Sequence, residues 1–228
     1  MTSRPVVLVP GFATSAARTW GDNGWLDLLR DIGRTPVPLD VLGSGSAAKP
    51  HDPESYAEFE EELLSRFPDG PVDAIGFSNG ARTLLVLAAT HPERFGSLIV
   101  AGVGRNLFES DATSERIAAA IDGTGNTDDP VVRYFVQLAE APDQDPLALA
   151  AFMRRERSFH LTPESLSAIS CPVLVVLGDR DFVGPADPLV DALRDARLMT
   201  LRNVDHFATP KDFGFIDAAL DFLGALDR

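Results

Sequence analysis

Short runs of β-branched and other apolar residues recur along the chain, and each run is followed by a turn and an amphipathic segment. Parallel strands need long crossover connections, usually helices, so this alternation is typical of an α/β fold. The pattern predicts strands at residues 4–10, 35–42, 72–77, 97–103, 172–177 and 197–201, and helices at 24–32, 54–67, 79–90 and 210–226. We therefore expect six mostly parallel strands in one sheet, flanked by helices.

The strand and helix rhythm breaks between the fourth and fifth strands. Residues 104–171 instead carry helical patterns at 109–121, 131–139 and 147–157. Ligands of parallel sheets bind beyond the carboxyl ends of the strands, where such insertions form lids or substrate pockets. We expect a core domain made of residues 1–103 and 172–228, with residues 104–171 inserted as a helical cap.

Net charge disfavours two classes of partner. The 228-residue chain is long enough for one buried core and has a formal net charge of −14, which repels phosphate backbones and anionic lipid surfaces. We expect a small-molecule substrate, with no nucleic-acid and no membrane partner. Basic residues cluster only at Arg154, Arg155 and Arg157, and their helical spacing predicts a solvated face. The oligomeric state stays open.

The cellular location is suggested by a single cysteine and by short apolar runs. The apolar run at residues 6–9 is bracketed by prolines and is far too short for a membrane span or a signal-peptide core. The chain has 1 cysteine, Cys171, which cannot form an internal disulfide and which we expect to be a buried thiol. These features predict a cytoplasmic protein.

The pentapeptide Gly76-Phe77-Ser78-Asn79-Gly80 lies between a predicted strand and a predicted helix. A G-x-S-x-G sequence in that context is typical of a nucleophile elbow, a tight turn that projects the serine hydroxyl outward. Small residues on both sides of the serine allow the strand and the helix to approach closely. Ser78 is thus the candidate nucleophile, and the alternative is an ordinary serine at a helix N-terminus.

A serine nucleophile needs a general base, and the imidazole of histidine suits that role at neutral pH. The chain has 4 histidines. His51, His91 and His160 follow no late strand, whereas His206 lies between the sixth strand and the last helix. Its loop is expected at the same sheet edge as Ser78, so we predict that His206 is the base.

A carboxylate is expected to orient the imidazole and to stabilise its cation. The segment after the fifth strand contains Asp179 and Asp181. The Gly-x-x-Asp spacing places Asp181 beyond the turn and facing the site, so Asp181 is preferred and Asp179 is its competitor. Asp205 is adjacent to His206 in sequence and is expected to form a local hydrogen bond instead.

Two backbone N–H groups are needed to stabilise the oxyanion of acyl transfer. One is expected from Asn79, which follows the nucleophile and opens a helix whose dipole favours negative charge. The other is expected from Phe12, in the loop after the first strand. The predicted site therefore consists of Ser78, His206 and Asp181 as the catalytic residues, with Phe12 and Asn79 as the oxyanion hole.

Motifs along most of the chain resemble the α/β-hydrolase superfamily. They are Val-Leu-Val-Pro-Gly-Phe at 7–12, Gly-Phe-Ser-Asn-Gly at 76–80, Cys-Pro-Val-Leu-Val-Val-Leu-Gly-Asp-Arg-Asp at 171–181 and His-Phe-Ala-Thr-Pro at 206–210. The resemblance implies the fold, the triad roles of Ser78, Asp181 and His206, and a helical cap after the fourth strand.

This chain departs from the family pattern near its beginning. Members commonly carry His-Gly after the first strand, where this chain has Pro10-Gly11 and so lacks one polar side chain beside the oxyanion hole. Many also begin with an extra antiparallel hairpin, which we expect to be absent here because the first strand starts at Arg4. We therefore expect an all-parallel sheet in the strand order 2-1-3-4-5-6.

These residues predict a serine hydrolase that cleaves a carboxylic ester of a small to medium apolar substrate through an acyl-enzyme. One alternative is hydrolysis of a carbon–carbon or enol-lactone bond by the same triad, and another is a ligand-binding protein without turnover. Aromatic residues of the insertion either line an acyl pocket or form the core of the cap. They are Phe108, Phe135, Phe152 and Phe159.

No cofactor and no metal are expected. Residues 43–48, Gly-Ser-Gly-Ser-Ala-Ala, match a dinucleotide-binding pattern. Pro50 and Pro53, however, prevent a helix from starting where a phosphate would bind. The 4 histidines also lack the spacing of metal ligands.

Overall fold

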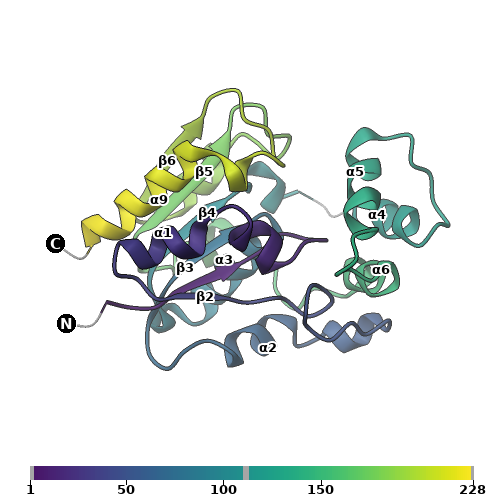
Figure 1. The fold of residues 1–228 in the computed structure, drawn as a ribbon, viewed down its shortest axis with the longest axis horizontal. Helices are drawn as coiled ribbons and strands as arrows, with labels where there is room; N and C mark the ends of the chain where they lie inside the picture. The colour runs from purple at the N-terminus through teal and green to yellow at the C-terminus, as the bar shows by residue number, and fades with distance from the viewer. Residues whose placement is uncertain (1–2, 110–112, 227–228) are drawn as a thin grey trace.

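Six parallel strands form one sheet at the centre of the molecule (Figure 1). The computed structural model describes residues 3–109 and 113–226. Every neighbouring pair of strands is parallel, and the order is β2-β1-β3-β4-β5-β6, which confirms the predicted fold class and strand order. The strands are β1 (Val6–Val9), β2 (Pro36–Pro38), β3 (Val72–Phe77), β4 (Phe95–Ala101), β5 (Val173–Gly178) and β6 (Ala196–Leu201).

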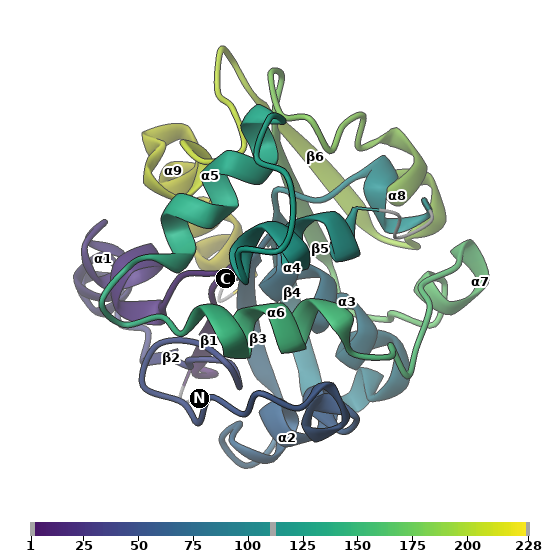
Figure 2. The same cartoon turned by 90° about the vertical axis from the view of Figure 1, so that its right-hand side faces the viewer.

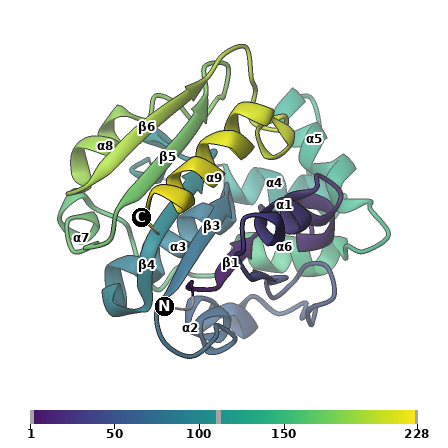
Figure 3. The same ribbon diagram turned by 60° about the vertical axis from the view of Figure 1, so that its left-hand side comes forward.

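Both faces of the sheet are buried, which explains why its central strands are mainly apolar. Side chains alternate along each strand, so Val7 and Val9 pack on one face, and Val6 and Leu8 pack on the other. Figure 3 shows α1 and α9 in front of the strands. The first face is covered by α2 (Phe59–Ser65), α3 (Asn79–Thr90) and α8 (Asp187–Ala192), and the second by α1 (Trp25–Asp31) and α9 (Phe213–Leu226).

Short helical turns complete the connections between these elements. Within the described residues, no helix combines the length and the apolar character needed to cross a bilayer. Sequence patterns did not predict the short turns, because one helical turn is too short to show an apolar period. The turns are η1 (Ala17–Gly21), η2 (Pro53–Tyr56), η3 (Pro92–Arg94), η4 (Arg105–Leu107), η5 (Thr209–Lys211) and α7 (Pro163–Leu166).

The predicted second strand and second helix have different boundaries in the structure. The strand predicted at 35–42 covers only Pro36–Pro38, because proline cannot donate to a strand ladder and is confined to sheet edges. The helix predicted at 54–67 is divided into η2 and α2. Asp52 caps the separate first turn by accepting the Glu54 N–H at 3.0 Å.

The insertion between β4 and β5 contains three main helices, α4 (Ser114–Ile121), α5 (Pro130–Ala139) and α6 (Pro146–Arg154). The helix predicted at 109–121 begins at Ser114, and residues 110–112 lie outside the described residues. Asp129 and Asp145 start α5 and α6 by accepting backbone N–H groups of the first turn. Figure 2 looks onto these helices, which lie across the carboxyl end of the sheet.

Arg155 contradicts the prediction of a solvated basic face at residues 154–157. This residue is 8% exposed, and its guanidinium carbon lies 3.6 Å from the centroid of the Phe152 ring and 5.0 Å from that of Phe59. The helix predicted to end at residue 157 ends at Arg154, because the backbone at Arg155 turns out of the helix with ψ 146°. A guanidinium is weakly hydrated and packs well on aromatic faces, so this cation is part of the core.

Candidate active site

Ser78 occupies the sharp turn between β3 and α3. Its backbone has φ 53° and ψ −116°, a conformation that residues other than glycine rarely adopt and that is concentrated at functional sites. The Ser78 N–H donates to the carbonyl oxygen of Ala101 at 2.8 Å, which joins the turn to the end of β4. The hydroxyl is therefore held at the carboxyl end of the sheet, where α3 begins.

Close backbone approach requires glycine on both sides of Ser78. A Cβ at Gly80 would lie 2.4 Å from the carbonyl oxygens of Val9 and Pro10, and a Cβ at Gly76 would lie 2.7 Å from Ala81 Cα. Both distances are far shorter than van der Waals contact. The G-x-S-x-G pattern is thus a packing requirement, since α3 starts directly against the end of β1.

His206 lies in the loop between β6 and η5 and is 3% exposed. Its Nδ1 lies 2.9 Å from Asp181 Oδ2, and its Nε2 lies 3.0 Å from Ser78 Oγ. An ionised carboxylate only accepts hydrogen bonds, so Nδ1 carries the proton and donates it to Asp181. Nε2 of the neutral ring then accepts a hydrogen bond from the Ser78 hydroxyl, which is the geometry needed for proton transfer to the ring.

Asp181, and not Asp179, contacts the imidazole. Asp181 is 8% exposed and also accepts the Val183 N–H at 3.1 Å, which fixes the orientation of its carboxylate. Asp179 instead accepts the Asn203 N–H at 2.7 Å and lies on the exposed side of the turn. The residue at the position after Gly178-Asp-Arg therefore faces the imidazole.

The other candidates from the sequence lie away from the hydroxyl. Asp205 accepts the Ala208 N–H at 2.9 Å, the local hydrogen bond expected of it. His51 and His91 each lie within ion-pair distance of a surface carboxylate. Across the described residues, no group of three or more His, Cys, Asp or Glu side chains is placed to hold a metal ion.

Three aromatic rings surround the imidazole of His206. The ring centroids of Phe182, Phe77 and Phe207 lie 4.8, 5.0 and 5.3 Å from the imidazole centroid. These contacts limit rotation of the imidazole and exclude water from its faces. Sequence reasoning missed Phe182 and Phe207, although each directly follows a predicted site residue, Asp181 or His206.

Phe12 and Asn79 lie where backbone N–H groups can serve the hydroxyl of Ser78. Phe12 follows the end of β1, and Asn79 is the first residue of α3. Both line one cavity together with Ser78. Among the described residues, neither N–H donates a hydrogen bond to another protein group. Free donors of this kind are what an oxyanion requires.

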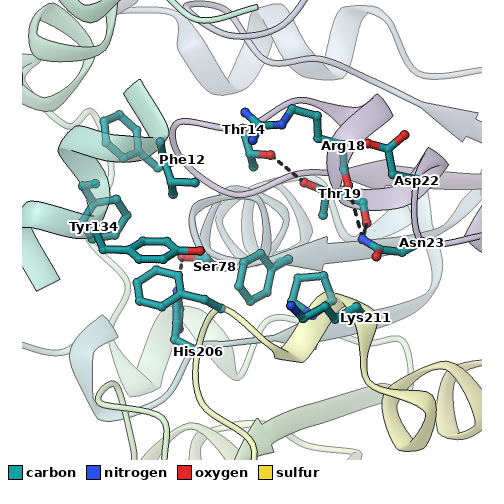
Figure 4. A pocket seen from close by; sticks show the side chains of 15 residues that line it. Phe12, Thr14, Arg18, Thr19, Asp22, Asn23, Ser78, Tyr134, His206 and Lys211 are labelled. Carbon is teal, nitrogen blue, oxygen red and sulfur yellow. Dashed lines mark hydrogen bonds between the residues drawn. The ribbon is translucent and has the colours of Figure 1, made fainter. Parts of the chain in front are cut away.

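Two cavities meet at Ser78. One has a volume of about 310 Å³ and the other about 370 Å³. Phe12, Ser78, Phe135 and His206 line both. The smaller cavity extends toward η1 and η5 (Figure 4), and the larger extends toward α4 and the segment that follows β4. The hydroxyl thus has space on two sides.

The four aromatics predicted for the insertion have different surroundings. Phe135 faces the cavities, whereas Phe152 is 3% exposed and stacks on Phe12 with a centroid distance of 5.7 Å. Phe108 and Phe159 are partly buried against the main core. The expectation that most of them form the core of the cap is wrong, because Phe108, Phe152 and Phe159 pack in or against the main core, and Phe135 is the one that lines both cavities.

Tyr134 of α5 is a cavity residue that the sequence analysis missed. Its ring stacks on Phe207 with a centroid distance of 3.6 Å and an interplanar angle of 26°. Burial raises the pKa of Tyr134 above its ordinary value, so the phenol is neutral at physiological pH. This stack joins the insertion directly to the loop that carries His206, a contact between distant segments that no local sequence pattern predicts.

Comparison with known proteins is consistent with this arrangement. The sequence profile described as alpha/beta hydrolase fold matches residues 4–132, which is more than half of the 228-residue chain. The chain belongs to the α/β-hydrolase fold family. It is therefore a hydrolase, as the motifs predicted.

Individual relatives and structures are similar over most of the chain. A protein of Neisseria meningitidis serogroup A, named pimeloyl-acyl-carrier-protein methyl ester esterase, is 29% identical over 221 residues, covering 82% of this chain and 68% of its own. A non-heme bromoperoxidase structure from Mycobacterium tuberculosis has a TM-score of 0.74 at 19% identity, covering 99% of this chain and 93% of its own. An esterase structure from Thermogutta terrifontis has a TM-score of 0.71 at 19% identity, covering 100% and 92%. At 19% identity, these structural matches support the fold alone.

Proposed function

We propose that this α/β hydrolase cleaves carboxylic esters through an acyl-enzyme on Ser78. The observation that most strongly supports this proposal is the chain of hydrogen bonds from Ser78 Oγ through the imidazole of His206 to Asp181. The esterase name of the relative that is 29% identical supports the same bond type. In this proposal His206 is the general base, Asp181 orients it, and the N–H groups of Phe12 and Asn79 hold the oxyanion.

The acylation step follows from this geometry. Ser78 Oγ attacks the ester carbonyl carbon while its proton moves to Nε2 of His206, and the carbonyl oxygen becomes an oxyanion that accepts from the Phe12 and Asn79 N–H groups. Asp181 stabilises the imidazolium through Nδ1–H. When the tetrahedral intermediate collapses, the bond to the alcohol oxygen breaks, and that oxygen takes the proton from His206.

Deacylation reverses the roles with water in place of the alcohol. His206 accepts a proton from water as the water oxygen attacks the acyl carbon, and a second oxyanion forms at the same N–H groups. The carbon–oxygen bond to Ser78 then breaks, and the proton on His206 returns to Oγ. The products are the alcohol and the carboxylic acid, and the enzyme regains its starting state.

The cavities support a substrate of small to medium size. An ester bound next to Ser78 can place its acyl part in one cavity and its alcohol part in the other, because both cavities reach the Ser78 hydroxyl. Phe12, Phe135 and Leu138 supply apolar lining. We propose that residues 104–171 act as the cap over this space, supported by the stacks of Tyr134 on Phe207 and of Phe12 on Phe152.

Replacing the hydroxyl tests the proposal. Ser78→Ala is expected to abolish hydrolysis of a generic aryl ester and covalent labelling by a serine-directed phosphonate, with thermal unfolding unchanged. Ser170→Ala, at an exposed serine, is the matched control and is expected to keep both activities. Turnover by Ser78→Ala equal to that of the unaltered chain would refute the assignment. An unaltered chain that neither turns over esters nor is labelled would instead be a ligand-binding protein.

A further inference from the structure

The smaller cavity has a cationic end that the chemistry proposed for Ser78 does not use. Figure 4 shows Ser78 and His206 at one end of this cavity, and Arg18, Asn23 and Lys211 at the other. The two cations lie on η1 and η5, which are far apart in sequence and contact each other. A group bound near them would therefore belong to the same molecule as the ester at Ser78.

The ammonium group of Lys211 is available to a ligand. In the part of the chain that the structure describes, its Nζ forms neither an ion pair nor a hydrogen bond. The carboxylate of the following residue, Asp212, is turned to the backbone at the start of α9, where it accepts the Gly214 N–H at 2.9 Å. The other lysine of the chain, Lys49, instead donates to backbone carbonyl oxygens.

Arg18 also keeps donors for a ligand. Among the residues that the structure describes, its ion pair is a single contact of 3.6 Å to Asp143 Oδ1, and the side chain is 41% exposed. A guanidinium has five N–H donors in a planar arrangement that suits a carboxylate. The side-chain amide of Asn23 donates to the carbonyl oxygen of Thr19 at 2.9 Å, which holds the turn that carries Arg18 in place.

Lys211 is the cation at this end that carries no ion pair within the described residues. Arg18 is paired with Asp143, and Asp22 is the carboxylate among the lining residues, so the cations and the nearby carboxylates balance. The chain as a whole has a net charge of −14 and repels anions at long range, so an anion would be held here by direct contact with the Lys211 ammonium. A neutral apolar ester would leave that ammonium unused.

We propose that Lys211 binds a carboxylate of the substrate, remote from the bond that Ser78 attacks. This inference rests on the proposed ester hydrolysis and specifies its substrate class, an ester that carries a free carboxylate. The carboxylate belongs either to the acyl part, as in a half-ester of a dicarboxylic acid, or to the alcohol part, as in an acylated hydroxy acid.

Kinetics on matched substrates test the assignment. One series consists of aryl half-esters of dicarboxylic acids of increasing length, the other of acetyl esters of hydroxycarboxylic acids, each compared with its neutral carboxamide. For the preferred series, Lys211→Met is expected to lower kcat/KM for the carboxylate about 10- to 100-fold, mainly through KM, since a hydrogen bond to a charged group has about that strength. The carboxamides should change less than about 2-fold, because they lack the charge.

Two further variants make the test specific to this end of the cavity. Asp22→Asn is expected to raise kcat/KM for the carboxylate substrates, because it removes the opposing charge. Lys49→Met removes the same charge far from the cavity and should change nothing. Equal kcat/KM for carboxylates and carboxamides in the unaltered chain, or an equal fall for both in Lys211→Met, would overturn the proposal.

Binding to Ser78→Ala separates this inference from the proposed function. Calorimetry on that variant measures affinity for the uncleaved carboxylate esters, and Lys211→Met in the same background should weaken it about 10- to 100-fold. Lysine-dependent binding without any turnover by the unaltered chain would support the anion site and refute ester hydrolysis. Turnover with affinity independent of Lys211 would support ester hydrolysis and refute the anion site.

Discussion

Adding one methyl group at Gly80 should separate the elbow from β1. A Cβ there would lie 2.4 Å from the carbonyl oxygens of Val9 and Pro10, whereas carbon–oxygen contacts between backbones lie at about 3.3–3.6 Å. Relieving the overlap in Gly80→Ala therefore requires the start of α3 to move by about 1 Å, taking the proposed Asn79 donor away from Phe12.

The magnitude follows from this displacement. Overpacking of this kind costs about 1–3 kcal/mol of unfolding free energy, which for a chain of this size lowers Tm by about 2–12 °C. A misplacement of about 1 Å at reacting groups lowers catalysis by about 100-fold. We thus expect Gly80→Ala to fold, to melt earlier, and to lose about 100-fold in kcat on an aryl ester.

Calorimetric melting and steady-state kinetics on the same preparations check both effects. Gly224→Ala in α9 is the matched control, because a Cβ there meets nothing within 4 Å. It should stabilise the helix by up to about 1 kcal/mol and leave kcat unchanged. If Gly80→Ala had the Tm and kcat of the unaltered chain, the packing argument would be wrong. If Tm fell but kcat did not, the proposed oxyanion hole would be wrong.

Two buried side chains remote from Ser78, those of Asp73 and Tyr56, give further tests. Asp73 accepts hydrogen bonds from Ser97 Oγ at 2.8 Å and from the guanidinium groups of Arg4 and Arg34. Asp73→Asn removes a negative charge from beside the buried Arg34 and should cost about 3–5 kcal/mol in urea unfolding; a loss below 1 kcal/mol would contradict the role of the charge. Burial raises the pKa of Tyr56 to about 12, above the value of about 10 in the unfolded chain. The folded state then holds the phenol proton more tightly than the unfolded state. The contribution of Tyr56 to the free energy of unfolding is therefore complete below pH 10 and is lost as the pH rises toward 12. Urea unfolding at pH 8 and pH 11 should show that loss in the unaltered chain and a smaller loss in Tyr56→Phe, and equal losses would contradict it.

Much of the fold could be predicted because its signals are local. A strand of a parallel sheet is buried on both faces, so β3, β4 and β5 are visible as mainly apolar runs, interrupted by Asp73 in β3 and Ser97 in β4. The amphipathic period of α3 and the pentapeptide at its start are also local sequence signals. Elements of one turn, and the edge strand β2 with its prolines, were predicted poorly because their form depends on neighbours distant in sequence.

The candidate site was predictable to the extent that parallel strands end at one edge. That rule alone predicted that the loops carrying Ser78, Asp181 and His206 lie together, and the structure has their side chains within hydrogen-bonding distance of one another. The choice of Asp181 over Asp179 was an argument from spacing, and the orientation of the two carboxylates is a property of the folded turn.

The sequence by itself determined the sheet, the turn at Ser78 and the set of candidate residues for acyl chemistry. Only the tertiary structure decided that Arg155 is buried, that Tyr134 stacks on Phe207, and that Arg18 and Lys211 share a cavity with the hydroxyl. Backbone preference and apolar periodicity act over a few residues and are legible in the chain. Contacts between segments far apart depend on how whole elements pack, and that packing is absent from any short stretch of sequence.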